Sequence, residues 1–84
     1  MNVQFTSRAD RDYDGLPLRL QRAVDKQLDF LREKPENLRH PSIQAKKYSE
    51  RDDVWQGRVN RSYRFYFQIV GDTYLILRII PHPK

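Results

Sequence analysis

The chain has 84 residues, of which 16 are Lys or Arg and 11 are Asp or Glu, so its net charge is +5. This length allows one domain over residues 1–84, with one sheet packed on one layer of helix. The chain has no cysteine, which excludes disulfides and thiolate metal sites, and no apolar run long enough to span a membrane. Its N-terminus lacks the apolar core of a secretion signal, so a cytoplasmic protein is expected. The excess positive charge suggests a polyanionic partner, with solubility alone as the alternative.

The N-terminal part predicts a strand followed by two helices. Val3 and Phe5 alternate with polar residues, as in an opening strand. Ser7, with Asp10 three residues later, has the pattern of an N-cap that begins a short helix. A longer amphipathic helix is predicted over residues 17–33, where apolar side chains recur every three or four positions: Leu16, Leu20, Val24, Leu28 and Leu31.

The remainder predicts a proline-containing loop and then strands. His40 lies in that loop and is interpreted as a structural residue. A short strand is expected over residues 43–48, and three closely spaced strands over residues 54–60, 63–70 and 73–80. The predicted fold is therefore α+β: a mostly antiparallel twisted sheet of four to five strands, with two N-terminal helices packed on one face.

The turn between the first two of these three strands decides which way their arginines face, because side chains alternate across a sheet. A three-residue turn over residues 60–62 pairs Arg58 with Arg64 and collects the aromatic side chains on the other face. A two-residue turn would put Arg58 beside Phe65 on the core side, where an unpaired charge is costly. The three-residue turn is therefore predicted, with Arg61 inside it.

Two registers are open at the next turn, which contains Gly71 and Asp72. This dipeptide is typical of a two-residue hairpin turn, but that register would place Arg78 against Phe65. A three-residue loop instead pairs Arg64 with Arg78, sends Leu75, Leu77 and Ile79 to the core, and is preferred. The polar face then gathers Arg58, Arg64 and Arg78 with Gln56, Tyr66, Gln68 and Tyr74.

Three arginines on neighbouring strands suggest a function, because like charges that face each other destabilise a sheet. The guanidinium group offers forked, permanently charged donors that match a phosphate group. The sequence therefore predicts a phosphate-binding face. The alternative is that nearby carboxylates neutralise the arginines, with Glu50, Asp52 and Asp53 as candidates.

The segment VWQGRVNRSYRFYFQIVGDTYLILRI resembles the last three strands of RelE/ParE-superfamily toxins of bacterial type II toxin–antitoxin systems. FTSRADRDYDGLPLRLQRAVDKQLDFL is similar to the N-terminal strand and helix pair of these toxins, and HPSIQAKKY to their histidine-proline loop and lysine-bearing strand. The resemblance covers nearly the whole chain. It implies a RelE/ParE-like fold, a cognate antitoxin as partner and a toxin–antitoxin hetero-oligomer.

Members of this family with RNase activity are ribosome-dependent mRNA interferases, which implies mRNA cleavage on the ribosome and inhibition of translation. Their arginine that contacts the scissile phosphate falls on Arg64, and the basic position of the preceding strand falls on Arg58. Several members carry an acid/base histidine, or a basic residue and a tyrosine, after the last strand. Here His82 and Lys84 stand there without a tyrosine.

Two features of the resemblance leave alternatives open. The glutamate that some members use as a general base falls near Gln44, so that role is unfilled unless Glu50 reaches the site. ParE-like members inhibit DNA gyrase and do not cut RNA. A further alternative is that this chain is a catalytically weak member that only binds a partner.

If the chain cleaves RNA, we expect no metal and no cofactor, since two histidines, no cysteine and no carboxylate cluster offer no metal site. The RNA 2′-hydroxyl would attack the phosphorus, arginines would stabilise the developing charge, and a histidine would protonate the leaving oxygen. The predicted catalytic residues are Arg58, Arg64 and His82. The predicted RNA-binding residues are Lys46, Lys47, Arg61, Tyr66, Tyr74 and Arg78.

Overall fold

The structure is a computed structural model that describes residues 1–82. Five strands form one sheet in the order β1-β5-β4-β3-β2, with β1 parallel to β5 and all other neighbours antiparallel. The strands are β1 (Asn2–Phe5), β2 (Lys46–Ser49), β3 (Val54–Arg58), β4 (Tyr63–Val70) and β5 (Thr73–Pro81). The helices are α1 (Ser7–Asp14), α2 (Leu18–Glu33) and a short 3-10 helix η1 (Pro35–Arg39). The predicted α+β fold with two N-terminal helices is confirmed.

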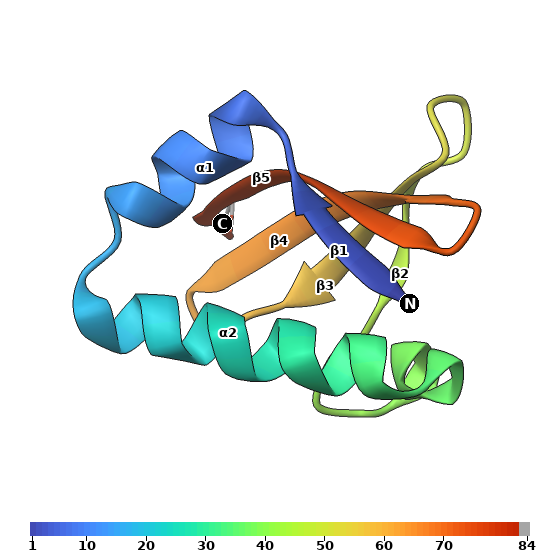
Figure 1. The fold of residues 1–84 in the computed structure, drawn as a ribbon, viewed down its shortest axis with the longest axis horizontal. Coiled ribbons are helices and arrows are strands. Elements are labelled where there is room, and N and C mark those ends of the chain that lie inside the picture. The colour runs from blue at the N-terminus through green and yellow to red at the C-terminus, as the bar shows by residue number, and fades with distance from the viewer. Residues whose placement is uncertain (83–84) are drawn as a thin grey trace.

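Helix α2 runs along one face of the sheet and buries the core against it (Figure 1). It begins directly after Pro17, whose missing N–H costs nothing at a helix start. Its buried stripe consists of Leu20, Val24, Leu28 and Leu31. On the sheet, the ring of Phe67 stacks on those of Phe65 and Trp55. No helix within residues 1–82 is long and apolar enough to cross a membrane.

The turn between β3 and β4 has the predicted three-residue form. Arg58 lies opposite Arg64 across the two strands. The side-chain oxygen of Asn60 accepts the backbone N–H groups of Ser62 at 2.8 Å and Tyr63 at 2.9 Å, which fixes the turn locally. The arginine pair and the aromatic core therefore lie on opposite faces, as the alternation predicted.

The turn between β4 and β5 differs from the prediction. Val70 lies opposite Thr73, so Gly71 and Asp72 form a two-residue turn, with Gly71 in the left-handed region at φ 60°. The predicted three-residue loop is therefore wrong.

A β-bulge in β5 keeps core and charge apart despite this shorter turn. Phe67 pairs with Ile76 but Tyr66 pairs with Arg78, so Leu77 is the extra residue. The bulge reverses the alternation of β5 at that point. The predicted pairing of Arg64 with Arg78 is therefore wrong, and Arg64 pairs with Ile80.

Residues of β5 before the bulge lie on the opposite face from the one predicted. Tyr74 and Ile76 point into the core, where Tyr74 is 2% exposed and lies edge-on to Phe67. Leu75 and Leu77, which were predicted to be core residues, are only partly buried. The prediction that Tyr74 binds RNA on the polar face is therefore wrong.

The side chain and backbone of Thr6 hold the bulge in place. Its hydroxyl donates to the Leu77 carbonyl at 3.1 Å, and its backbone N–H donates to the Ile76 carbonyl at 3.0 Å. The same hydroxyl accepts the N–H of Ala9 at 3.1 Å and so caps α1. The predicted N-cap, Ser7, is instead the first helical residue. Beyond this point α1 follows β5 where β1 no longer covers it (Figure 1).

Replacement of Thr6 tests this connection. We expect Thr6→Ala to lose about 1–2 kcal/mol of unfolding free energy, because both the helix cap and the bond to the bulge disappear. Thr6→Ser keeps the hydroxyl and should stay within about 0.5 kcal/mol of the wild type. Urea unfolding followed by circular dichroism measures both values. Equal midpoints for the alanine and serine variants would contradict the role of the hydroxyl.

Gly57 provides a second test, because the ring of Phe65 lies directly across its missing side chain. A Cβ at position 57 would lie 2.3 Å from Cζ of Phe65, which is fully buried. We expect Gly57→Ala to cost about 1–3 kcal/mol through overpacking. Gly15→Ala is the matched control, since its Cβ would meet nothing nearer than 3.5 Å and its φ of −80° suits alanine. A thermal melt in which both variants match the wild type would show that Phe65 can shift freely.

Candidate phosphate-binding site

The sheet face opposite α2, here called the arginine face, carries Gln56, Arg58, Arg64, Tyr66 and Arg78. Nη1 of Arg64 donates to the carbonyl oxygens of Asn60 at 2.6 Å and Tyr63 at 2.9 Å, so the guanidinium is held over the β3–β4 turn. Within residues 1–82, neither Arg58 nor Arg64 forms an ion pair with a carboxylate. The two adjacent positive charges are therefore available to an external anion.

His82 lies at the same end of the sheet. Its backbone N–H donates to the Ser62 carbonyl at 2.7 Å, which continues the pairing of β5 one residue beyond Pro81. Alternation from Ile80 through His82 places its exposed imidazole on the arginine face. The pairing of the strands thus places Arg58, Arg64 and His82 at the same end of the sheet, while their catalytic roles stay predictions. Arg61 lies exposed in the adjoining turn, and its RNA-binding role likewise stays a prediction.

Arg78 differs from the other two arginines because α1 supplies its counterion. Its Nε donates to Oδ2 of Asp12 at 2.7 Å and its Nη2 to Oδ1 at 3.3 Å. Oδ2 of Asp12 also accepts the backbone N–H of Ile79 at 3.0 Å, which satisfies the edge of β5. A carboxylate does neutralise one arginine, but it comes from α1 and not from the predicted residues 50–53.

These contacts decide the ionisation of Asp12. Burial raises the pKa of its carboxyl group, but the hydrogen bonds from Arg78 and from the Ile79 N–H, with the charges of Arg78 and Arg8, outweigh burial. The net pKa of Asp12 is lowered below its ordinary value of 3.8. The pair is therefore ionised at neutral pH.

The two adjacent lysines of β2 lie on opposite faces of the sheet. Lys46 is opposite Gln56 and shares the arginine face. Lys47 is opposite Trp55, with its Nζ 4.8 Å from the centre of that ring and 2.6 Å from Oδ1 of Asp53. Only Lys46 is placed to assist a ligand of the arginine face. The hydrogen bond to Asp53 raises the pKa of Lys47, so it is also unsuited to act as a base.

Tyr66 lies at the centre of the arginine face but presents little of its own surface. It is 6% exposed because Tyr48 covers it edge-on, with ring centres 4.9 Å apart. Burial, with a contribution from Tyr48, raises the pKa of the Tyr66 phenol despite the opposing charge of Arg64. Tyr66 is therefore neutral at physiological pH. The aromatic ring that faces solvent belongs to Tyr48, which no pattern in the sequence singled out.

Neither Glu50 nor Gln44, the two positions considered from the sequence, is placed to act as a general base. Glu50 is exposed in the turn before Val54, whereas Arg58 ends the same strand, so the length of β3, about 13 Å, separates them. Gln44 is exposed and has a φ of 49°, in a loop before β2. The condition under which Glu50 could serve as the base is therefore not met.

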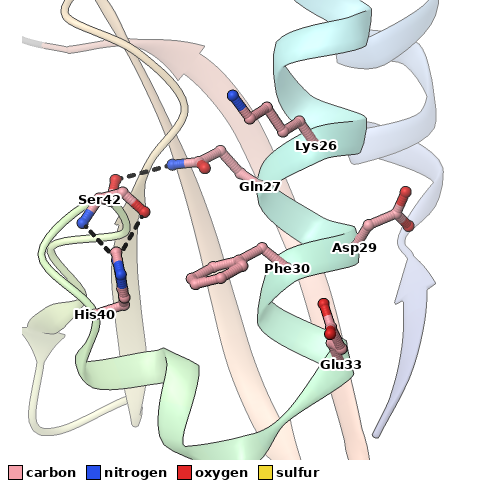
Figure 2. A pocket seen from close by; sticks show the side chains of 7 residues that line it. All are labelled: Lys26, Gln27, Asp29, Phe30, Glu33, His40 and Ser42. Atoms are coloured by element: carbon pink, nitrogen blue, oxygen red, sulfur yellow. Dashed lines mark hydrogen bonds between the residues drawn. The ribbon is translucent and has the colours of Figure 1, made fainter.

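A groove of about 480 Å³ lies between α2 and the loop after η1, away from the arginine face (Figure 2). Nδ1 of His40 accepts the backbone N–H of Ser42 at 3.1 Å, and the ring lies edge-on to Phe30 at 4.7 Å. Nε2 of Gln27 donates to the carbonyl oxygens of Ser42 at 2.9 Å and Arg58 at 2.8 Å. These contacts fix the loop to α2 and position the end of β3, so His40 acts within the fold.

Comparison with known proteins identifies the family. The sequence profile of the ParE toxin of the type II toxin–antitoxin system parDE matches residues 3–83. The chain belongs to this family of toxins. The resemblance to RelE/ParE-superfamily toxins stated above is thereby confirmed. A search of curated protein sequences found no match.

Solved toxin–antitoxin complexes share the fold. The RelE–RelB complex from Pyrococcus horikoshii is 18% identical with a TM-score of 0.77, and covers 95% of this chain and 92% of that chain. The RelBE complex from Escherichia coli is 16% identical with a TM-score of 0.73, covering 99% and 98%. The RelBE2 complex from Mycobacterium tuberculosis is 27% identical with a TM-score of 0.68, covering 96% of both chains.

The Asp12–Arg78 pair predicts a pH dependence of stability. A carboxyl whose pKa is lower in the folded than in the unfolded chain stabilises the fold above its unfolded pKa, and this contribution is lost as pH falls through the folded value. We expect Asp12→Asn to cost about 2 kcal/mol at pH 7. The difference from the wild type should shrink below pH 3.8 and then vanish.

Urea unfolding at several pH values measures this difference. Asp14→Asn is the control, because Asp14 is exposed on the same helix and forms no ion pair within residues 1–82. A cost of Asp12→Asn that stays constant down to pH 2 would rule out the ionised pair as its source.

Proposed function

We propose that this toxin is a metal-independent, ribosome-dependent endoribonuclease that cleaves mRNA and thereby inhibits translation. The observation that carries the proposal is the cross-strand pair of Arg58 and Arg64, which faces solvent without a carboxylate partner within residues 1–82. Two arginines at paired positions of neighbouring strands suit a phosphodiester, whose charge spreads over its non-bridging oxygens as it reacts.

The residues around this pair support the reaction. Arg64 uses Nη1 to hold the turn carbonyls, so its other donors are oriented before an RNA phosphate arrives. The 2′-hydroxyl of the RNA attacks the adjacent phosphorus and releases its proton to solvent. The bond from phosphorus to the 5′-oxygen breaks, and the imidazolium of His82 donates its proton to that oxygen. The products are a 2′,3′-cyclic phosphate and a free 5′-hydroxyl.

The partner of this toxin is proposed to be a cognate antitoxin in the cytoplasm. The solved relatives from P. horikoshii, E. coli and M. tuberculosis are complexes of a toxin with its antitoxin. An acidic or amphipathic antitoxin segment would cover the arginine face in a hetero-oligomer. Arg58 and Arg64 are its expected charge partners, because Arg78 is already neutralised by Asp12.

A second candidate function is inhibition of DNA gyrase without RNA cleavage. The specific observation in its favour is that the matching family profile is that of ParE toxins. In this reading the same basic face would bind a protein partner or DNA, and His82 would have no chemical role.

Primer extension on translated mRNAs, with and without ribosomes, separates these functions. The wild type should produce cuts only when ribosomes are present. Arg64→Ala should lower the rate of cutting about 100-fold, because it removes a donor to the transition state. His82→Ala should lower it by a similar factor if it is the proton donor. Arg19→Ala is the control, since it removes an equal charge from an exposed position on α2.

Each outcome that contradicts the proposal refutes a different part of it. Full cutting by His82→Ala would refute the assignment of the proton donor alone. Cutting unaffected by Arg64→Ala would refute the site. Intact mRNA together with induction of the DNA damage response in cells would favour the gyrase inhibitor.

A further inference from the structure

A second hollow lies on the arginine face itself, next to the arginine pair. This groove has a volume of about 220 Å³ and is lined by Tyr48, Val54, Tyr66, Leu77, Arg78 and Ile80. Five of these six side chains are apolar or aromatic, and a purely electrostatic site would not need them. A mostly apolar groove on a strongly basic face suits a ligand that is both flat and anionic.

Tyr48 forms the exposed wall of this groove. It lies in edge strand β2 at an irregularity between Lys47 and Ser49, where the register with β3 shifts. Tyr48 is 61% exposed, and its only aromatic neighbour within residues 1–82 is Tyr66, which it meets edge-on. An edge-on contact leaves a face of the ring available for stacking.

Arg78 lines the groove as a second flat group in a fixed position. Asp12 engages its Nε and Nη2, and no side chain or carbonyl within residues 1–82 accepts a hydrogen bond from Nη1. The ion pair therefore orients the guanidinium plane and still leaves donors for a ligand. This explains why an arginine with an internal counterion is part of the arginine face.

The groove lies one step along the sheet from the arginine pair. The row of Gln56, Tyr66 and Arg78 follows the row of Arg58, Arg64 and Ile80 by two residues on each strand. Two residues of a strand span about 7 Å. A nucleotide has its phosphate and its base at a comparable separation.

We propose that the groove binds one unpaired nucleobase of a single-stranded RNA whose phosphate lies on Arg58 and Arg64, with the base stacked on Tyr48. The proposal rests on the proposed function in taking RNA as the ligand. Charge favours RNA, because Arg58, Arg64 and Lys46 surround the groove with positive charge that a neutral apolar segment would leave unpaired.

The test is direct binding of the full chain to a fluorescent 2′-O-methyl RNA hexamer, which cannot be cleaved through its 2′-oxygen. Tyr48→Ala should weaken binding about tenfold, the usual effect of losing one stacked base, while Tyr48→Phe should bind like the wild type. Leu18→Ala is the matched control, because Leu18 is also 61% exposed but lies on α2.

Hexamers with one abasic position at a time make the test specific. At one position, loss of the base should weaken wild-type binding about tenfold but leave Tyr48→Ala unchanged, because the partner of that base is already missing. Equal losses for both proteins at every position would overturn the proposal. Wild-type affinity in Tyr48→Ala would also overturn it. If an acidic peptide binds in a Tyr48-dependent manner and the hexamer does not, the groove is a protein site.

The two proposals fail separately. Binding that depends on Tyr48, together with intact mRNA in the primer-extension assay, would refute the nuclease and keep the groove. Ribosome-dependent cutting that requires Arg64, together with RNA binding that ignores Tyr48, would refute the groove and keep the nuclease.

Discussion

The bulge at Leu77 is the constraint on which both faces of this sheet depend. A two-residue turn at Gly71 and Asp72 sets one alternation for β5, and without the bulge Arg78 would turn toward the aromatic core. One extra residue reverses the alternation where it is needed, so Ile76 and Ile79 both reach the core although they are three residues apart. Thr6 holds this irregularity from the start of the chain. The separation of the apolar core from the arginines therefore depends on a tertiary contact and not on the sequence of β5 alone.

The connection from β1 through Thr6 into α1 also sets the charge of the arginine face. Since α1 lies along β5 beyond the end of β1, its Asp12 satisfies both a strand-edge N–H and the guanidinium of Arg78. Arg58 and Arg64 lie on β3 and β4, whereas α1 packs mainly on β5. Their mutual repulsion is tolerated because turn carbonyls hold Arg64 and because both side chains keep contact with water. Arg78 is thus held by an internal counterion, whereas Arg58 and Arg64 have no carboxylate partner within residues 1–82.

The sequence allowed some of these features to be predicted and concealed others, for physical reasons. The β3–β4 register followed from alternation because its two faces differ sharply: a slip would bury Arg58. In β5 nearly every residue from Leu75 to Ile80 is apolar, so either alternation gives a plausible core and the pattern is uninformative. The deciding contact comes from Thr6, 71 residues away from Leu77. Which of Lys46 and Lys47 lies on the arginine face could not be predicted, because it depends on the register of an irregular edge strand. Tyr48 is exposed on that same strand.

The lack of a carboxylate beside Arg58 and Arg64 within residues 1–82 favours anion binding and at the same time leaves no general base there. A carboxylate near Arg58 and Arg64 could accept the proton of the attacking hydroxyl, but it would compete with phosphate for both guanidinium groups. The nearest candidate from the sequence, Glu50, lies at the far end of β3. Within residues 1–82, the face therefore favours binding and transition-state charge over proton abstraction. In the proposed nuclease, such a site would accelerate cleavage most when something else aligns the RNA for attack, and a ribosome-bound mRNA would bring that alignment.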